Sequence, residues 1–173
     1  MNTDVLFSSN KEDWETPQDF FDELNKEFDF NVDVCADKTN YKCPYFLDKE
    51  TDALEWTWTY CHLASEGKLG DGTPVRTWIG LASRAWCNPP YNRSTGKWVA
   101  KAVEEVNKGN AKVVVMLLPA RTDTKYFHQY IWDNEKHRPR PGVEVRFIKG
   151  RLKFGGAKNS APFPSMVVIF RKG

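Results

Sequence analysis

The sequence feature that most constrains the fold is the run KVVVMLL at residues 112–118, which is apolar after its first residue. A strand with one face in water alternates apolar and polar residues, whereas a strand covered on both faces is apolar throughout. Segments with helical spacing occur at residues 16–28 and between Tyr91 and Gly109, with short strand-like segments between them. This alternation predicts an α/β fold, with helices covering a mostly parallel sheet.

The first helix has a recognisable start. Thr16 suits an N-cap, Pro17 suits the first helical position, and Asp19 adds an acidic group to the first turn. Both helices have an apolar face. It comprises Phe20, Phe21, Leu24 and Phe28 in the first helix, and Trp98, Ala102, Val103 and Val106 in the second.

The remaining expected elements are shorter. They are strands at residues 30–35, 84–87, 143–148 and 166–170, a further short strand at 53–58, and a helix at 122–132. No helix separates the last two strands, so the final strand is expected to be antiparallel. The stretch EGKLGDGTP, within residues 61–83, predicts a loop insertion between core elements.

The 173 residues are most simply one domain, 1–173, with a loose polar segment at 1–13. No stretch approaches the about 20 apolar residues of a membrane span, and the start MNTDVLFSSNKEDW does not resemble a signal peptide. Four cysteines without C-x-x-C or zinc-finger spacing are expected to be free thiols, and no metal site is expected. We therefore expect a cytoplasmic protein.

Charge is distributed unevenly along the chain. Residues 1–92 hold 8 Lys/Arg and 17 Asp/Glu, whereas residues 93–173 hold 17 Lys/Arg and 6 Asp/Glu. Clustered cations gain affinity for nucleic acids by releasing counterions from the phosphates. The basic half indicates a nucleic-acid partner, the alternative being a solvated surface on which the charges mix after folding.

Polar groups follow three of the expected strands. They are the segments 33–37, 88–91 and 119–123. Because ligands of open α/β sheets bind beyond the carboxyl ends of the strands, these segments predict a binding site.

The segment Asn88-Pro89-Pro90-Tyr91 has a chemistry of its own. The Asn88 side-chain oxygen and the Pro89 carbonyl are two acceptors that suit one planar NH₂ group, and the Tyr91 ring can stack on the group that carries the amine. Accepting both amine protons localises the nitrogen lone pair, so that attack on an electrophilic methyl group depends mainly on positioning. A rigid turn with a capping Asn is the plainer alternative.

These four residues match the (Asp/Asn/Ser)-Pro-Pro-(Tyr/Phe) signature of amino-methyltransferases. More closely, the chain resembles the small phage-type DNA adenine-N6 methyltransferase family. The resemblance covers residues 14–170 through WETPQDFF, DVCA, WCNPPY, LLPARTDT, RFIKGRLKF and APFPS. It implies a compact Rossmann-like methyltransferase fold, S-adenosylmethionine as the cofactor, double-stranded DNA as the partner, and a phage or prophage gene expressed in a bacterial host.

The resemblance also implies roles for individual residues. Asn88, Pro89, Pro90 and Tyr91 would be catalytic, and the cofactor would lie against Thr16, Pro17, Asp33, Cys35, Ala36 and Asp52. The glycine-rich turn of the wider methyltransferase class is absent and is replaced by VCAD at residues 34–37.

DNA contacts are expected from Arg121, Asp123, Arg151, Lys153 and Phe154. Arg121 and Asp123 could instead form a local ion pair, and residues 151–154 could be a plain surface hairpin. The insertion at 61–83 and the basic stretch KHRPR at 136–140 are further candidate DNA contacts.

The resemblance predicts transfer of a methyl group to N6 of adenine in DNA, after the base has flipped out of the duplex. An RNA or protein-glutamine methyltransferase with the same chemistry, and a non-catalytic nucleic-acid-binding module, remain alternatives. The target sequence and the oligomeric state are left open.

Overall fold

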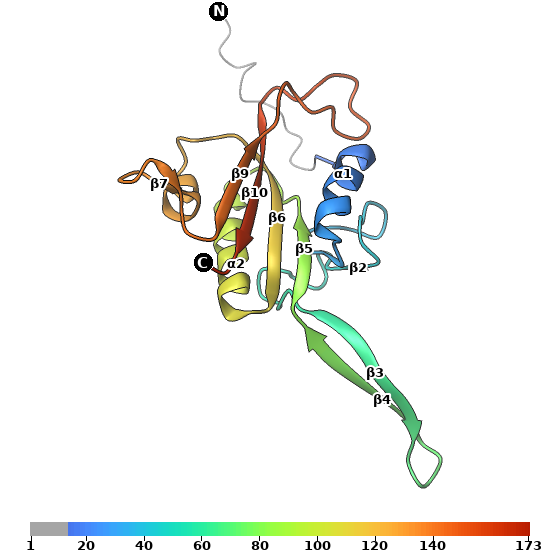
Figure 1. The fold of residues 1–173 in the computed structure, drawn as a ribbon. Helices are drawn as coiled ribbons and strands as arrows, with labels where there is room; N and C mark the ends of the chain where they lie inside the picture. Colours follow the sequence, from blue (N-terminus) through green and yellow to red (C-terminus); the bar gives the residue numbers. More distant parts are fainter. Residues whose placement is uncertain (1–13) are drawn as a thin grey trace, which may run out of the picture.

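The computed structural model describes residues 14–173, so the expected loose segment at 1–13 lies outside the described residues. At its centre is a six-stranded sheet with the order β2-β1-β5-β6-β10-β9 (Figure 1). Its strands are β1 (Val32–Asp33), β2 (Tyr45–Phe46), β5 (Ser83–Cys87), β6 (Ala111–Pro119), β9 (Val143–Phe147) and β10 (Ser165–Arg171). Two small sheets pair β3 (Tyr60–Lys68) with β4 (Pro74–Leu81) and β7 (Trp132–Asp133) with β8 (Arg138–Pro139). The helical elements are α1 (Gln18–Phe28), α2 (Thr95–Lys108) and the π-helix η2 (Phe127–Ile131).

Strands β2, β1, β5 and β6 run parallel to one another, and β10 is antiparallel to both of its neighbours, β6 and β9. The prediction of a mixed α/β fold with a mostly parallel sheet and an antiparallel last strand is confirmed. The carboxyl ends of β1, β5 and β6 consequently share one edge of the sheet, the upper edge in Figure 1.

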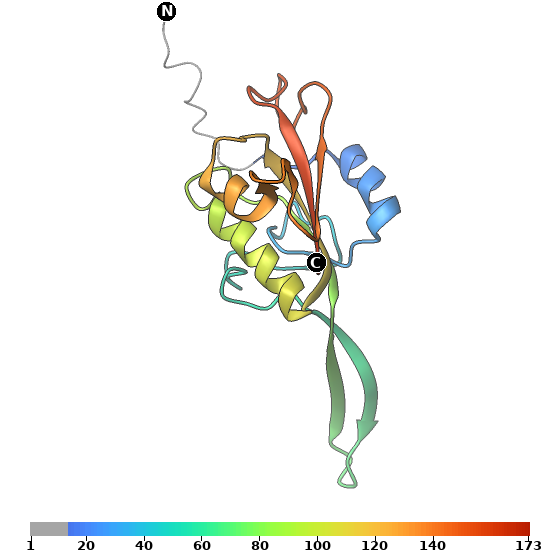
Figure 2. The same ribbon diagram turned by 60° about the vertical axis from the view of Figure 1, so that its left-hand side comes forward.

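Strand β6 contributes to two cores because its side chains alternate between the two faces of the sheet. Val114, Met116 and Leu118 pack in the core that includes α2, whereas Val113, Val115 and Leu117 pack in the core that includes α1. Figure 2 shows the two helices on opposite sides of the sheet. Burial of each of these larger side chains contributes about 1.5–3 kcal/mol, which explains why the run at 112–118 is apolar throughout.

The predicted helix that starts near Thr16 is confirmed as α1, but Thr16 does not cap it. The Thr16 hydroxyl instead accepts a hydrogen bond from the Asn88 side chain, 72 residues away in the sequence. The predicted second helix is confirmed as α2 and ends at Gly109, whose φ of 79° is a conformation that glycine adopts without strain.

The expected loop at 61–83 is wrong. Strands β3 and β4 form a long antiparallel hairpin there, closed by residues 69–73 with Gly72 at a φ of 86°. The loop-forming sequence therefore occupies only the tip of the hairpin. Since β4 leads into the amino end of β5, the hairpin projects from the lower edge of the sheet, away from its carboxyl edge (Figures 1 and 2).

The expected strand at 53–58 is also wrong. The backbone turns there, with the N–H groups of Glu55 and Trp56 both donating to the Asp52 carbonyl. Trp58 is fully buried because it packs against Trp98 of α2 and not because it lies in a sheet. The expected helix at 122–132 is confirmed only in part, since its regular portion includes η2 but residues 122–124 form turns and a bend.

None of the helices within residues 14–173 is long and apolar enough to cross a bilayer.

Candidate active site

A cavity of about 540 Å³ opens at the carboxyl ends of β1 and β5. Among the predicted site residues, it is lined by Thr16, Asp33, Cys35, Ala36, Asp52, Asn88 and Pro90. Pro17, Pro89 and Tyr91 are not part of its lining, nor is the segment at 119–123. Two of the three predicted strand ends therefore meet at this cavity.

The cavity wall holds Asn88 by both hydrogens of its side-chain amide. Nδ2 donates to the Trp14 carbonyl at 2.5 Å and to the Thr16 hydroxyl at 2.9 Å. An amide nitrogen has two hydrogens, so its donor capacity is used. Oδ1 of Asn88 thus stays an acceptor.

Oδ1 of Asn88 itself accepts a hydrogen bond from the Tyr91 hydroxyl at 2.8 Å, and the same hydroxyl lies 3.2 Å from the Leu117 carbonyl. Burial raises the pKa of Tyr91 well above its usual value, so the hydroxyl stays neutral and can donate. A carbonyl-type oxygen has two lone pairs, and Oδ1 therefore keeps one for a ligand.

The two proline carbonyls of the motif differ. The Pro90 carbonyl accepts from the Thr95 hydroxyl at 2.8 Å, which ties the motif to the start of α2. The Pro89 carbonyl accepts no hydrogen bond from any residue within 14–173. Asn88 Oδ1 and the Pro89 carbonyl therefore both keep acceptor capacity, although Pro89 is buried and only Asn88 lines the cavity.

Asp33 organises the turn that follows β1. Its two carboxylate oxygens accept from the backbone N–H groups of Cys35 at 3.2 Å and Lys42 at 3.0 Å, although the side chain is only 3% exposed. Burial raises the pKa of Asp33 to about 6 against the opposing effect of these bonds. Asp33 therefore shapes the cavity wall formed by residues 34–37.

Asp52 also lines the cavity, in a left-handed conformation with a φ of 47°. Short polar residues tolerate this conformation best, and it allows the Asp52 carbonyl to close the turn to Trp56. The Asp52 side chain is exposed.

The residues that sequence reasoning missed lie in two segments that close one side of the cavity. Trp14 and Glu15 line it together with Gly155 of the β9–β10 loop, and the Gly155 N–H donates to the Glu15 carbonyl at 2.8 Å. The tryptophan ring packs between Phe154 and Phe163, at centroid distances of 5.3 and 5.2 Å. The motifs WETPQDFF and APFPS included Trp14, Glu15 and Phe163 but not Gly155, and no spacing rule connects segments so distant in the sequence.

The expected DNA contact at Phe154 needs correction. Phe154 is 1% exposed, and its ring lies against Trp14 and against Tyr91, whose ring centroid is 6.2 Å away. It therefore packs against the Asn-Pro-Pro-Tyr segment through Tyr91 and has no face open to a base. Phe163 is the second edge-on neighbour of Tyr91.

The other expected DNA contacts are exposed, and Arg121 and Asp123 form no ion pair with any described residue. Arg151 and Lys153 lie in the β9–β10 loop, where Arg151 donates to the Ala161 carbonyl at 3.4 Å. Neither the hairpin at 60–81 nor KHRPR at 136–140 contributes to the cavity lining.

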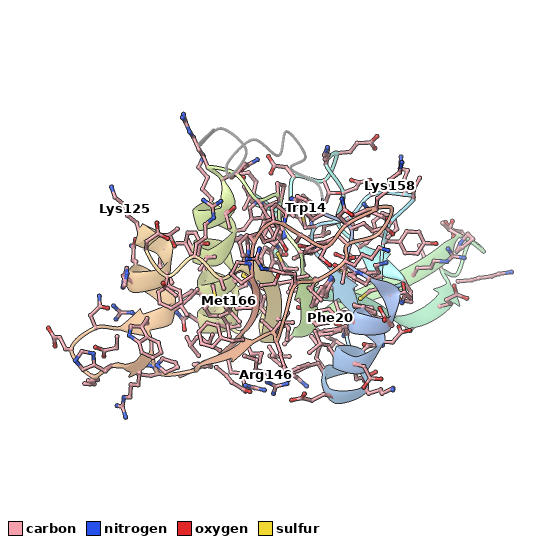
Figure 3. All side chains as sticks on the ribbon, turned by 90° about the horizontal axis from the view of Figure 1, so that it is seen from above. Trp14, Phe20, Lys125, Arg146, Lys158 and Met166 are labelled. Carbon is pink, nitrogen blue, oxygen red and sulfur yellow. The ribbon has the colours of Figure 1, made fainter. Side chains whose placement is uncertain are left out.

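The loops and helix starts at the carboxyl edge of the sheet carry a group of exposed cations, which we call the basic rim. No member of the rim forms an ion pair with another described residue. The rim consists of Arg93, Lys97, Arg121, Lys125, Lys149, Arg151, Lys153 and Lys158. Seen from above, Lys125 and Lys158 lie on opposite sides of Trp14 (Figure 3).

The sequence is similar to those of known DNA methyltransferases. A family model described as DNA N-6-adenine-methyltransferase (Dam) matches residues 4–68 and 70–172. The chain is also 26% identical over 166 residues to the DNA N-6-adenine-methyltransferase of Haemophilus phage HP1 (strain HP1c1), a match that covers 94% of this chain and 80% of that relative.

Proposed function

Since the chain belongs to the DNA N-6-adenine-methyltransferase (Dam) family, we propose that its cavity binds S-adenosylmethionine and that Asn88 receives the N6 amine of an adenine flipped out of duplex DNA. The observation that carries this proposal is the state of the Asn88 amide. Both of its hydrogens are bound to the protein, while Oδ1 and the neighbouring Pro89 carbonyl keep acceptor capacity for an NH₂ group.

The cavity suits the cofactor in size and charge. Its volume of about 540 Å³ lies within the range of small-molecule sites. Its lining has five carboxylates, Glu15, Asp33, Asp37, Asp48 and Asp52, and two lysines, Lys42 and Lys49. An excess of carboxylates favours a ligand that carries a sulfonium and an ammonium group, and we assign Asp52 to the adenine amine. Thr16, Pro17, Cys35 and Ala36 would border the same ligand.

When bound, S-adenosylmethionine supplies an electrophilic methyl group. Asn88 Oδ1 and the Pro89 carbonyl hold the two protons of the target amine and orient its lone pair. The Tyr91 ring lies beside the adenine ring, and its hydroxyl keeps Oδ1 in place. No ionisable side chain other than neutral Tyr91 bonds to Oδ1 in the described structure. The proton lost after transfer therefore leaves to solvent.

The basic rim, which includes Arg121, Arg151 and Lys153, is the surface that we assign to the DNA backbone. Flipping a base costs a few kcal/mol, and phosphate contacts by unpaired cations offset this cost in a salt-dependent way. The hairpin at 60–81 is not assigned to DNA, because it leaves the sheet at the opposite edge.

We further propose a single Rossmann-like methyltransferase domain that acts in the cytoplasm of a bacterial host, from a phage or prophage gene. This rests on the sheet topology and on the similarity to the phage HP1 protein.

Methyl transfer from labelled S-adenosylmethionine to duplex DNA, RNA and protein acceptors tests the proposal. Incorporation into duplex DNA is expected. Incorporation only into RNA or protein would mean that the same chemistry acts on another substrate. Absence of cofactor binding in calorimetry would indicate a non-catalytic module.

A further inference from the structure

We infer that the segment Trp14–Thr16, here called the strap, sets the direction in which the Asn88 amide points and so selects an amide over a carboxylate at position 88. This inference rests on the proposed function, because it concerns how the Asn88 oxygen is presented to the target amine. The strap would then act as a positioning element for the reaction in addition to lining the cavity.

The three groups around the amide differ in their hydrogen-bonding capacity. The hydroxyls of Thr16 and Tyr91 can each donate or accept, so either would tolerate an amide rotated by 180°. The Trp14 carbonyl can only accept. A rotated amide would bring Oδ1 against that carbonyl oxygen, and the Trp14 carbonyl therefore determines the direction.

The second partner of Tyr91 strengthens this assignment. The Tyr91 hydroxyl lies 3.2 Å from the Leu117 carbonyl, so it could donate there and accept from a rotated Asn88 nitrogen. Tyr91 alone would thus permit both amide directions. The directional constraint comes from the Trp14 carbonyl of the strap, while Thr16 binds the second amide hydrogen and keeps it from the solvent.

The strap is held by the loop between β9 and β10. The Gly155 N–H donates to the Glu15 carbonyl at 2.8 Å, and the Trp14 ring lies between Phe154 and Phe163. Gly155 approaches so closely that an added Cβ would lie 2.9 Å from Glu15 Oε2. The β9–β10 loop, which carries part of the basic rim, therefore packs directly on the strap.

A consequence concerns aspartate at position 88, which the amino-methyltransferase signature accepts. In Asn88→Asp, a carboxylate oxygen would replace the amide nitrogen that now donates to the Trp14 carbonyl at 2.5 Å. When the carboxylate is ionised, two acceptor oxygens would then face each other without a hydrogen between them. A protonated carboxyl group could donate to that carbonyl instead. The variant is therefore expected to be poorly active at alkaline pH and to recover part of its activity at acidic pH, relative to wild type.

Three variants test the inference. Thr16→Val removes the hydroxyl at nearly constant volume, and Thr16→Ser is the matched control that keeps it. We expect kcat to be about tenfold or more lower in Thr16→Val than in Thr16→Ser, because small misplacements of reacting groups have large effects on rate. The dissociation constant for S-adenosylmethionine should differ little between the two variants. For Asn88→Asp we expect kcat to fall about 100-fold at pH 8, with partial recovery at pH 6.

Wild-type kcat in Thr16→Val, or full activity in Asn88→Asp at pH 8, would overturn the inference. So would weakened cofactor binding with unchanged kcat in Thr16→Val, since Thr16 would then serve only the cofactor.

A measurement that does not depend on methyl transfer can test this inference separately from the proposed function. In ¹⁵N NMR spectra, the side-chain NH₂ signals of Asn88, assigned with Asn88→Ala, should exchange slowly with solvent in the wild-type protein. One of the two should exchange faster in Thr16→Val and not in Thr16→Ser. Fast exchange of both protons in the wild type would contradict the strap, even if DNA methylation is confirmed, and slow exchange would support it even if DNA methylation is not found.

Discussion

The Tyr91 hydroxyl donates to Asn88 Oδ1 at 2.8 Å, so the aromatic residue that ends the Asn-Pro-Pro-Tyr motif is bonded to the side chain that begins it. Tyr91→Phe keeps the ring and removes this bond. A neutral hydrogen bond contributes about 0.5–1.5 kcal/mol, so we expect kcat to fall about two- to tenfold with little change in cofactor affinity. Steady-state kinetics with calorimetry measures both. A loss as large as that in Asn88→Ala would mean that the hydroxyl has a direct role in the chemistry.

Asn88→Ala removes one of the two acceptors assigned to the target amine. We expect S-adenosylmethionine and DNA to bind with nearly wild-type affinity while kcat falls about 100-fold or more, as for removal of a preorganised transition-state contact. Binding isotherms and single-turnover rates give the two quantities separately. Turnover near the wild-type level would contradict the assignment.

Asp33→Asn is expected to destabilise the protein by about 1–3 kcal/mol, because one of the two backbone N–H groups at 3.2 and 3.0 Å loses its acceptor. The pKa of Asp33 is raised to about 6, above its value of 3.8 in an unfolded chain. The folded state therefore holds this proton more tightly between those values, and the contribution of Asp33 to stability decreases as the pH rises from about 4 to about 6.

Urea unfolding of the wild type and of Asp33→Asn across this pH range tests that sign. The stability of the wild type relative to the variant should decrease toward pH 6 and then level off. If this difference in stability instead grew with pH, the two backbone hydrogen bonds would lower the pKa of Asp33 by more than burial raises it.

The double variant Arg151→Ala/Lys153→Ala should weaken DNA binding and lower the slope of log K against log salt by about one for each phosphate that the protein no longer neutralises. The matched control is Lys136→Ala/Arg138→Ala, which removes two exposed cations away from the cavity lining. Filter binding at several salt concentrations compares the two. Equal losses in both variants would contradict the assignment of DNA to the basic rim.

Shortening the β3–β4 hairpin, by replacing residues 65–76 with an Asn-Gly turn, should leave cofactor binding and turnover unchanged, because the hairpin leaves the sheet at the edge opposite Asn88. Calorimetry and the methylation assay check this. A loss of DNA affinity in a variant that still folds would show that the hairpin contributes to DNA binding.

Local sequence patterns predicted the elements whose buried residues are continuous in the sequence or recur at helical spacing. The run at 112–118 predicted a buried central strand, and the apolar stripes predicted α1 and α2. The pattern failed at 53–58, because Trp58 is buried by a helix that follows it by about 40 residues. It also failed at 61–83, where turn residues at one tip were taken to represent the whole segment.

For the site, the rule that ligands bind beyond the carboxyl ends of strands predicted that Asp33 and Asn88 line the same cavity, as they do. It did not predict the hydrogen bonds from Asn88 to Trp14 and Thr16, which join residues more than 70 positions apart. Thr16 had a sufficient local explanation as a helix cap, and only the tertiary structure shows its hydroxyl bound elsewhere. The burial of Phe154 was unpredictable for the same reason, since its partners come from three separate segments.

The most direct test of the account is mass spectrometry of the nucleosides released from duplex DNA after incubation with S-adenosylmethionine and either wild-type protein or Asn88→Ala. The account predicts N6-methyldeoxyadenosine with the wild type and almost none with the variant. Methylation of a cytosine instead of adenine, no methylated nucleoside, or equal adenine methylation by both proteins would contradict it.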